Sequence, residues 1–205
     1  GIDTDRTNSV VLADVDADGD LDLIVGNNGE INKLYLNDGN GGYPATGTAI
    51  GSETDQTWNI TLADIDGDGD LDLIAGNSNQ TNKLYLNDGS GGFSATGTAI
   101  GNEADSTTSI TLADVDADGN LDLITGNSSN QTNKLYLNNG SGGCSATGTP
   151  LGSETDTTAS VVLADVDAEG DLDLIAANFN QINKLYFNDS NAVSTFFSRK
   201  CSRGG

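Results

Sequence analysis

Short apolar segments of alternating polarity recur along the chain, and glycine, asparagine or aspartate separates each segment from the next. The clearest segment is 21–25, in which Leu21, Leu23 and Val25 share one face while Asp22 and Ile24 share the other. Alternation with a period of two in such short segments is typical of half-buried strands. No window carries the i, i+3, i+4, i+7 stripe of an amphipathic helix, so the pattern predicts an all-β protein.

Four copies of one unit follow each other at spacings of 50, 50 and 51 residues. Their shared Leu-Ala-Asp triplets end at Asp14, Asp64, Asp114 and Asp165. Each copy holds four short segments, and four strands in about fifty residues is the size of a β-propeller blade. We therefore predict a single propeller domain over 1–205, built from four blades of four antiparallel strands each. The expected blades are approximately 1–50, 51–100, 101–151 and 152–205.

One four-stranded sheet of this size buries little apolar surface, so the copies must stack on one another. We expect Leu12, Leu23 and Leu34 of the first copy, together with their counterparts in the other copies, to face inward and fill the layers between blades.

An acidic loop follows the first segment of every copy, and in the first copy it reads Asp-Val-Asp-Ala-Asp-Gly-Asp-Leu-Asp over 14–22. Ca²⁺ takes about six to eight oxygen ligands in a flexible geometry. Carboxylates at loop positions 1, 3 and 5 converge if the chain coils tightly. Glycine at position 6 allows the sharp turn, position 7 offers its backbone carbonyl, and aspartate at position 9 completes the shell. The same spacing four times argues against an acidic turn that is merely solvated.

An EF-hand loop starts in the same way, but it needs glutamate at position 12 and flanking helices. Position 12 here holds valine, alanine or threonine, and the flanks are predicted strands. We therefore predict one Ca²⁺ per copy, four in all; Mg²⁺ fits less well because it keeps several waters in an octahedral shell. The predicted ligands are Asp14, Asp16, Asp18, Asp20 and Asp22; Asp64, Asp66, Asp68, Asp70 and Asp72; Asp114, Asp116, Asp118, Asn120 and Asp122; and Asp165, Asp167, Glu169, Asp171 and Asp173.

Composition narrows the range of functions. The chain has 31 acidic and 8 basic residues, no histidine and a formal net charge of −23. Such a polyanion is not expected to bind nucleic acid, which requires Lys and Arg against phosphates, and no apolar run suits membrane insertion. Nineteen of the acidic residues lie in the four loops, so the charge is concentrated where the metal is predicted.

The motif LADVDADGDLDLIVGN, repeated together with NKLYLNDG, resembles the FG-GAP/VCBS repeats of integrin α-subunit propellers and of many secreted bacterial proteins. The resemblance implies propeller blades with Ca²⁺ in the loop between the first and second strands. It assigns ligand roles to Asp14, Asp16, Asp18 and Asp22, with the carbonyl of Asp20. Glu169 departs from the family pattern and has a longer arm.

The number of copies leaves the overall assembly open, because well-known members of this family close with seven blades. The alternatives are a closed ring of four blades, half of a larger ring completed by a second chain in a homodimer, and a fragment. Exposed strand edges and blade faces in a fragment would tend to pair or aggregate. We favour the closed four-bladed ring.

A ligand surface is expected on the face opposite the calcium loops, because there the copies differ. Trp58, which we place in the connector between blades, stands where the other copies have Asn, Thr or Ala. Arg6 and Phe179 are also unique to their copies. These three residues are the candidates for binding a glycan or a protein, and packing between blades is the alternative role for each of them.

The recurring Lys33, Lys83, Lys134 and Lys184 could form an anion site, but structural ion pairs with the acidic connector residues are favoured. A Cys144–Cys201 disulfide and two free thiols are equally compatible with the sequence. We predict a calcium-stabilised binding or adhesion module that is secreted or at the cell surface, as in bacterial relatives, and is not an enzyme. The alternatives are a carbohydrate-active lyase or hydrolase and a purely structural repeat array.

Overall fold

The computed structural model describes residues 3–188 and 197–199. Every regular element in these ranges is a strand, and the strands form four antiparallel sheets of four strands each. The strands are β1 (Thr7–Ala13), β2 (Asp22–Asn27), β3 (Asn32–Tyr35) and β4 (Thr48–Ile50); β5 (Thr57–Ala63), β6 (Asp72–Asn77), β7 (Asn82–Tyr85) and β8 (Thr98–Ile100); β9 (Thr107–Ala113), β10 (Asp122–Asn127), β11 (Lys134–Tyr136) and β12 (Thr149–Pro150); and β13 (Thr158–Ala164), β14 (Asp173–Asn178), β15 (Lys184–Phe187) and β16 (Phe197–Arg199). The predicted all-β class and the four strands in each copy are confirmed. The described residues include no helix long and apolar enough to cross a membrane.

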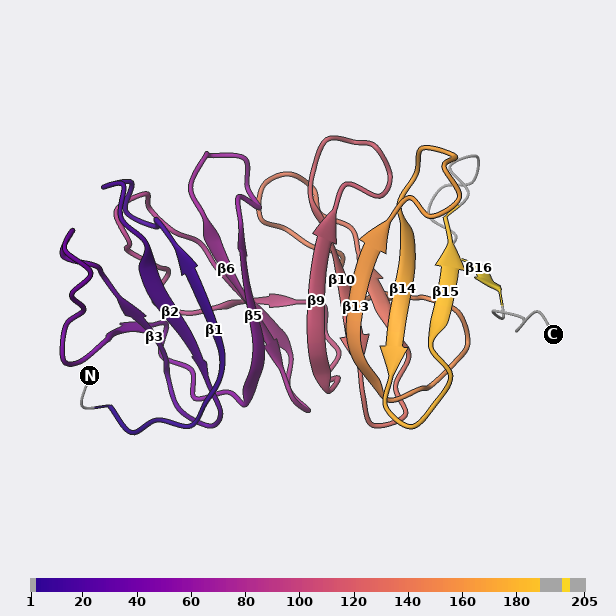
Figure 1. The fold of residues 1–205 in the computed structure, drawn as a ribbon, viewed down its shortest axis with the longest axis horizontal. Coiled ribbons are helices and arrows are strands. Elements are labelled where there is room, and N and C mark those ends of the chain that lie inside the picture. The colour runs from indigo at the N-terminus through magenta and orange to yellow at the C-terminus, as the bar shows by residue number, and fades with distance from the viewer. Residues whose placement is uncertain (1–2, 189–196, 200–205) are drawn as a thin grey trace.

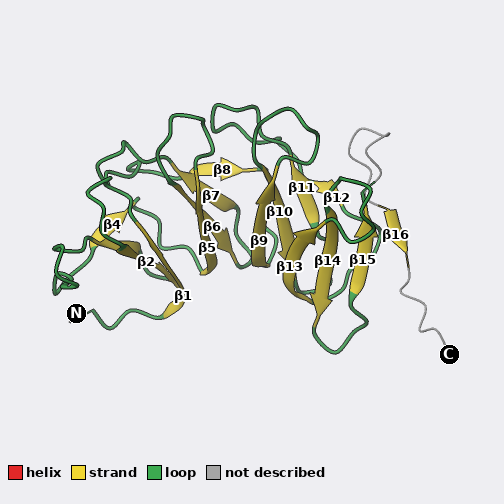
Figure 2. Ribbon diagram, turned by 45° about the horizontal axis from the view of Figure 1, so that its top comes forward, coloured by secondary structure: helices red, strands yellow, loops and turns green. Residues whose placement is uncertain are grey.

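Each sheet is a meander, because its strand order follows the chain order. We refer to the four sheets with their loops as blades 1 to 4. They stand side by side along a curved row, with β1, β5, β9 and β13 lining its concave side (Figures 1 and 2). This arrangement is that of propeller blades.

The row of blades is an open arc, and blades 1 and 4 lie at its two ends (Figures 1 and 2). The closed four-bladed ring that we favoured from the sequence is therefore not formed. The physical reason is that the turn from one blade to the next is too small for four blades to complete a circle.

Both faces of a blade are apolar, in contrast to the single inward face predicted from the leucines. Leu12 pairs with Leu23, whereas Leu34 pairs with Ile24 and so lies on the opposite face. Leu34 is buried, but Leu12 is 54% exposed because it lies on the face of blade 1 that no other blade covers. An inner blade needs two apolar faces since it has a neighbour on each side.

The core consists of three apolar layers, one between each pair of neighbouring blades. The layer between blades 1 and 2 contains Val15, Ile24, Leu34, Ile50, Ile60, Leu73, Ala75 and Tyr85. Glycine lets the blades approach closely at this layer: a Cβ at Gly26 would lie 2.8 Å from Ile60 Cγ2 and 2.9 Å from Thr57 Cγ2 of the next blade. Gly76 and Gly126 occupy the same place in blades 2 and 3.

Candidate metal centres

The acidic loop of each blade is a tight coil between the first and second strands. In blade 1 the loop leaves β1 at Asp14 and enters β2 at Asp22. Ala17 and Gly19 adopt left-handed conformations with φ of 59° and 94°. Glycine is needed at position 6 because its large positive φ is disfavoured for residues with a Cβ. This coil turns successive odd-numbered side chains toward one another.

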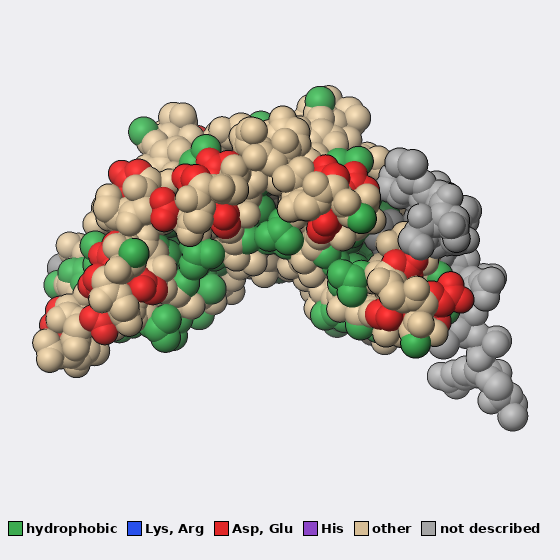
Figure 3. Space-filling view, turned by 90° about the horizontal axis from the view of Figure 1, so that it is seen from above, with side chains coloured by type: hydrophobic (Ala, Val, Ile, Leu, Met, Phe, Trp, Pro, Cys, Tyr) green, Lys and Arg blue, Asp and Glu red, His purple; other side chains and the backbone are tan. Residues whose placement is uncertain are grey.

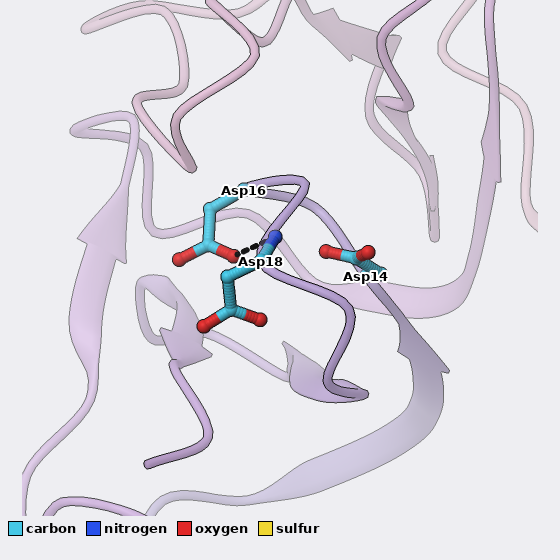
Figure 4. A group of neighbouring side chains, drawn as sticks. All are labelled: Asp14, Asp16 and Asp18. Carbon is cyan, nitrogen blue, oxygen red and sulfur yellow. Dashed lines mark hydrogen bonds between the residues drawn. The ribbon is translucent and has the colours of Figure 1, made fainter. Parts of the chain in front are cut away.

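Backbone N–H groups of the loop donate to its own carboxylates. Asp14 Oδ2 accepts from Gly19 N at 3.0 Å, and Asp18 Oδ1 accepts from Asp20 N at 2.9 Å. Asp16 Oδ1 accepts from Asp18 N at 3.3 Å, the contact drawn in Figure 4. The bonds hold the three acidic side chains around the turn, although these groups repel each other when charged.

The aspartate at position 9 connects this loop to the loop between the third and fourth strands. Asp22 is fully buried, and its Oδ2 accepts from Val15 N at 3.0 Å while its Oδ1 accepts from Asn37 N at 2.9 Å. Asp72, Asp122 and Asp173 repeat both contacts with distances of 2.9–3.1 Å. The predicted ligand at position 9 therefore also has a structural role.

Each blade brings three carboxylate oxygens within 4.8 Å of one another. The groups are Asp14, Asp16 and Asp18; Asp64, Asp66 and Asp72; Asp114, Asp116 and Asp122; and Asp165, Asp167 and Asp173. Positions 1 and 3 belong to every group, whereas the third member is position 5 in blade 1 and position 9 in the others. In blade 4 the loop residues Asp165, Asp167 and Glu169 are all exposed.

The electrostatics of the loops fit a cation. Burial and the neighbouring carboxylates Asp22 and Asp18 raise the pKa of Asp16, and burial and Asp68 do the same for Asp66. Asp14 Oδ1 is buried and accepts no hydrogen bond from any described residue. All potential ligand atoms are oxygens, which suit a hard divalent ion. The four groups are thus candidate metal sites, one in each blade.

The side chain at position 7 points away from the acidic cluster. A Cβ at Gly39 would lie 2.9 Å from Asp20 Oδ2, so the Asp20 side chain lies against the turn between β3 and β4. Gly89 and Gly140 lie in the same way against Asp70 and Asn120. The contribution of the backbone carbonyl at position 7 to a metal site stays a prediction.

The metal loops lie on one rim of the arc. Gly91, in the turn between β7 and β8, donates its N–H to Val15 O at 3.2 Å, so this turn shares the rim with the loop of blade 1. Seen from this rim, acidic side chains gather in one group after another along the arc (Figure 3). We call this edge the metal rim. The opposite rim carries the loops between second and third strands and the connectors between blades, as Asn28 N donating to Arg6 O at 2.8 Å indicates.

The three candidate ligand residues lie apart on the opposite rim. Trp58 is the second residue of β5 rather than part of the connector, and its side chain is 48% exposed. Arg6 precedes β1 in blade 1, and Phe179 follows β14 in blade 4 with 66% exposure. The structure therefore does not bring the three together into one site within this chain.

Three of the four repeated lysines form the expected ion pairs; among the described residues Lys83 of blade 2 has no carboxylate within ion-pair distance. Lys33 Nζ lies 3.0 Å from Asp3 Oδ1 and 2.6 Å from Asp5 Oδ2. Lys134 pairs with Glu103 and Asp105, and Lys184 pairs with Glu154 and Asp156. These pairs fix the connectors to the third strands. For the predicted disulfide, Cys144 contacts the core layer between blades 2 and 3, whereas Cys201 lies outside the described residues.

An asparagine that was not predicted from the sequence joins the metal loops of neighbouring blades. Asn87 Nδ2 of blade 2 donates to Val15 O of blade 1 at 2.8 Å, and Asn138 Nδ2 of blade 3 donates to Ile65 O of blade 2 at 2.8 Å. Its recurrence after the NKLYL motif was the available signal, but so many asparagines recur in this chain that the signal was not distinctive.

A family model for the FG-GAP-like repeat matches residues 14–75, 64–125 and 114–176. The matches cover most of the chain and include all four acidic loops. The chain belongs to the FG-GAP-like repeat family. A search of curated protein sequences finds no match.

Solved structures with similar folds include proteins of different kinds. An Agrocybe aegerita lectin, described by its specific recognition of non-reducing terminal N-acetylglucosamine, aligns with a TM-score of 0.60 and 20% identity over 92% of this FG-GAP chain and 51% of the lectin chain. BBS1N, solved in complex with ARL6DN, aligns with a TM-score of 0.58 and 13% identity over 98% of this chain and 58% of the other. A candidate exo-β-1,3-galactanase from Bifidobacterium bifidum s17 aligns with a TM-score of 0.56 and 13% identity over 94% and 71% of the two chains. At these identities the likeness shows the fold alone. The FG-GAP chain spans just over half of the length of the first two structures.

Proposed function

We propose that this FG-GAP-repeat chain is a Ca²⁺-stabilised binding module of an extracellular protein, with its ligand surface on the rim opposite the metal loops. One contrast carries the proposal. The metal rim is nearly the same in all four blades, while the opposite rim differs and presents Trp58 with half of its side chain exposed.

Calcium suits the candidate sites better than other ions. The ligand sets are rich in carboxylates and offer no nitrogen or sulfur atom. The residues that would hold the ion in blade 2 are Asp64, Asp66, Asp68 and Asp72, with the carbonyl of Asp70. Bound Ca²⁺ supplies positive charge that removes the repulsion between these carboxylates. Sites of this type in extracellular modules work at about 10⁻⁴–10⁻³ M Ca²⁺, which supports a location outside the cytosol.

A glycan is the ligand class that Trp58 favours. Large aromatic side chains offer an apolar face for packing and a polar N–H at the edge, and they are enriched where ligands bind. Trp58 lies near the start of β5, at the end away from the metal loop that begins at Asp64. The equivalent residues are the smaller Asn8, Thr108 and Ala159, so no blade requires a tryptophan at this place. The lectin with a related fold supports the proposal by analogy.

A glycan array probed in Ca²⁺-containing buffer tests the proposal. We expect the wild-type chain to bind a subset of glycans and Trp58→Asn, which introduces the residue of blade 1, to lose that binding by tenfold or more. The matched control is Phe179→Ser, which introduces the blade 2 residue on the same rim and should keep the glycan binding. Binding that survives in Trp58→Asn would overturn the assignment of the site, and no binding by the wild type would favour a structural array.

An enzymatic function has weaker support. The candidate galactanase among the related structures favours a carbohydrate-active enzyme. The acidic connector pairs, whose carboxylates are the residues that could serve as acid and base, are engaged by lysine in blades 1, 3 and 4. Two carboxylates tied to the same ammonium group are poorly placed to exchange protons with a substrate. We therefore favour binding over catalysis.

A further inference from the structure

Exposed large apolar side chains are concentrated in the two end blades. Among the described residues, blade 1 contributes Val10, Leu12, Leu21, Leu36 and Tyr43, and blade 4 contributes Val162, Val166, Phe179 and Ile182. Trp58 is the single such residue of the inner blades. Exposed apolar side chains gathered on a surface in this way indicate an interaction site.

The uncovered face of blade 1, which we call the back face, matches a face that is buried in the inner blades. Val10 is 63% exposed, whereas its equivalents Ile60 and Val161 are 6% and 4% exposed. Tyr43 is 40% exposed and takes the place of Phe93, which packs against the layer between blades 1 and 2. An open pocket of about 300 Å³ on this face is lined in part by Leu23, Val25 and Tyr43. The back face thus has the form of an unfilled half of an inter-blade layer.

The uncovered face of blade 4, which we call the front face, is the other half of such a layer. Val166 is 44% exposed, while the equivalent Val15 and Ile65 are 3% and 4% exposed under the next blade. Val162 is 51% exposed, whereas the equivalent Val11 of blade 1 packs against the layer between blades 1 and 2. The front face of blade 4 therefore exposes apolar side chains of the kind that a following blade covers elsewhere in the chain.

The polar contacts between blades also have a fixed direction, with donors on the back face of one blade and acceptors on the front face of the preceding blade. Ile60 N of blade 2 donates to Ser9 Oγ of blade 1 at 3.2 Å, and Val161 N of blade 4 donates to Ser109 Oγ of blade 3 at 3.2 Å. The asparagine bonds from Asn87 to Val15 and from Asn138 to Ile65 run in the same direction. The back face carries the corresponding donors, Val10 N and the Asn37 amide. The front face carries the corresponding acceptors, Ser160 Oγ and Val166 O.

Two residues that are unique to their blades occupy matching places on the two end faces. On the rim opposite the metal loops, Asn28 of blade 1 forms a β-bridge with Gln56 of blade 2, and Ser78 of blade 2 forms one with Ser106 of blade 3. Phe179 of blade 4 is equivalent to Ser78, and Arg6 of blade 1 is equivalent to Ser106. A fifth blade with the sequence of blade 1 would place Arg6 beside Phe179, and a guanidinium group against an aromatic ring is attractive.

We propose that the front face of one copy docks onto the back face of a second copy, and that two such contacts close an eight-bladed ring from two chains. Each joint reuses the packing already present between neighbouring blades of one chain. Propellers typically have about four to eight blades, so two copies reach a known size whereas three exceed it. Closure with twofold symmetry removes both exposed faces, while an unclosed head-to-tail contact would extend into a filament.

The joint between copies is looser than the joints within the chain. Ala177 of blade 4 stands where the other blades have Gly26, Gly76 and Gly126, whose hydrogen atoms face the next blade. A Cβ at Gly126 would lie 3.0 Å from Val161 Cγ1, so the methyl group of Ala177 pushes Val10 of the second copy outward by a few tenths of an ångström. The docking is accordingly reversible and depends on concentration.

The mass of the chain in solution tests the proposal directly. In Ca²⁺-containing buffer, light scattering over a concentration series should show a particle of twice 21.0 kDa that dissociates on dilution. Leu12→Asp on the back face and Val162→Asp on the front face should each give monomers with unchanged melting temperatures at high dilution. Trp58→Asn, an exposed apolar residue of an inner blade, is the control and should keep the dimer.

Mixing the two monomeric variants distinguishes head-to-tail docking from other contacts. Leu12→Asp retains a normal front face and Val162→Asp retains a normal back face, so an equimolar mixture should recover particles of two chains. A wild type that stays monomeric, a Val162→Asp variant that stays dimeric, a mixture that stays monomeric or a mass that grows beyond two chains would each overturn the proposal.

Two further variants test the register of the joint. Ala177→Gly should tighten the dimer several-fold, because it restores the glycine of the inner joints; weaker association would contradict the proposed reuse of inter-blade packing. In a Cys144→Ser, Cys201→Ser background, Arg6→Cys together with Phe179→Cys should give a disulfide-linked dimer on oxidation, whereas either cysteine alone should not. Failure of the double variant to cross-link would contradict the register.

Discussion

At the scale of single residues, the carboxylate of Asp3 holds the connector of blade 1 in place by accepting hydrogen bonds from three donors. Asp3 accepts from Tyr35 Oη at 2.6 Å, from Gly47 N at 3.0 Å and from Lys33 Nζ at 3.0 Å. The hydrogen bond from Tyr35, followed by those from Gly47 and Lys33, lowers the pKa of Asp3 to about 2. Burial and the bond to Asp3 raise the pKa of Tyr35 to about 12. The charged carboxylate is therefore a stabilising group near neutral pH.

This arrangement predicts a defined dependence of stability on pH. Asp3→Asn should lower the melting temperature at pH 7, because the amide replaces a carboxylate whose pKa is depressed in the folded state. A depressed pKa contributes stability above the ordinary value of 3.8 that disappears as the pH falls toward about 2. The difference in melting temperature between wild type and variant should shrink over that interval when followed by circular dichroism.

Tyr35→Phe is the matched variant for this prediction. It removes the donor with the largest effect on the Asp3 pKa, so the pH dependence attributable to Asp3 should become smaller without vanishing. A difference between wild type and Asp3→Asn that stays constant from pH 7 to pH 2 would contradict the assignment.

At the scale of the blade, an asparagine side chain fastens blade 2 and blade 3 each to the metal loop of the preceding blade. Asn87 is 5% exposed and donates to Val15 O at 2.8 Å and to Leu71 O at 3.2 Å. These bonds satisfy a carbonyl of each of two blades. The stability of a blade therefore depends partly on its neighbour's loop, as expected for a repeat protein.

We predict that Asn87→Ala lowers the free energy of unfolding by about 1–3 kcal/mol, because Leu71 O loses this donor and Val15 O is left with the 3.2 Å bond from Gly91 N. For a chain of this size that corresponds to roughly 2–4 °C in melting temperature per kcal/mol. Asn37→Ala is the control, since Asn37 holds the same position in blade 1 but donates only within its own blade, to Leu21 O at 3.0 Å. Thermal unfolding at a dilution that keeps the chain monomeric should separate the two; equal losses would contradict the role of the inter-blade bond.

The blade was largely predictable from the sequence, because strand alternation, the fifty-residue period and the aspartate spacing are local patterns. The position of Trp58 within β5 was not predictable, because the pairing of β5 with β6 is irregular between Thr57 and Asn59. The open arc was not predictable either. Whether four blades close into a ring depends on the angle between neighbouring blades, which is repeated at every joint. That angle is set by packing between blades and cannot be deduced from the sequence pattern of one blade.

At the scale of the whole molecule, the four candidate metal sites govern how strongly the acidic chain repels itself. At a Ca²⁺ concentration ten times the dissociation constant, each occupied site contributes about 1.4 kcal/mol, so four contribute roughly 5–6 kcal/mol. Chelation by EDTA should therefore lower the melting temperature by roughly 10–20 °C. Calorimetry with and without added Ca²⁺ measures the effect, and a melting temperature unchanged by EDTA would refute the calcium assignment.

Magnesium provides the control for that experiment. Mg²⁺ added in excess to the chelated chain should restore little of the lost stability, because it keeps its octahedral water shell. Full recovery with Mg²⁺ would mean that charge screening, rather than coordination by Ca²⁺, accounts for the effect.

The glycines at the joints between blades have a consequence for how such a chain can change over evolutionary time. Gly26, Gly76 and Gly126 make successive joints nearly interchangeable, so duplicating one fifty-residue segment would add a blade whose two faces fit both new neighbours. A gain or loss of this kind leaves every existing joint intact, whereas an insertion within a blade would break its sheet. Recombination within the gene therefore alters the number of blades more readily than any other feature of this architecture. Two chains with closely similar repeats can accordingly differ in length by whole blades.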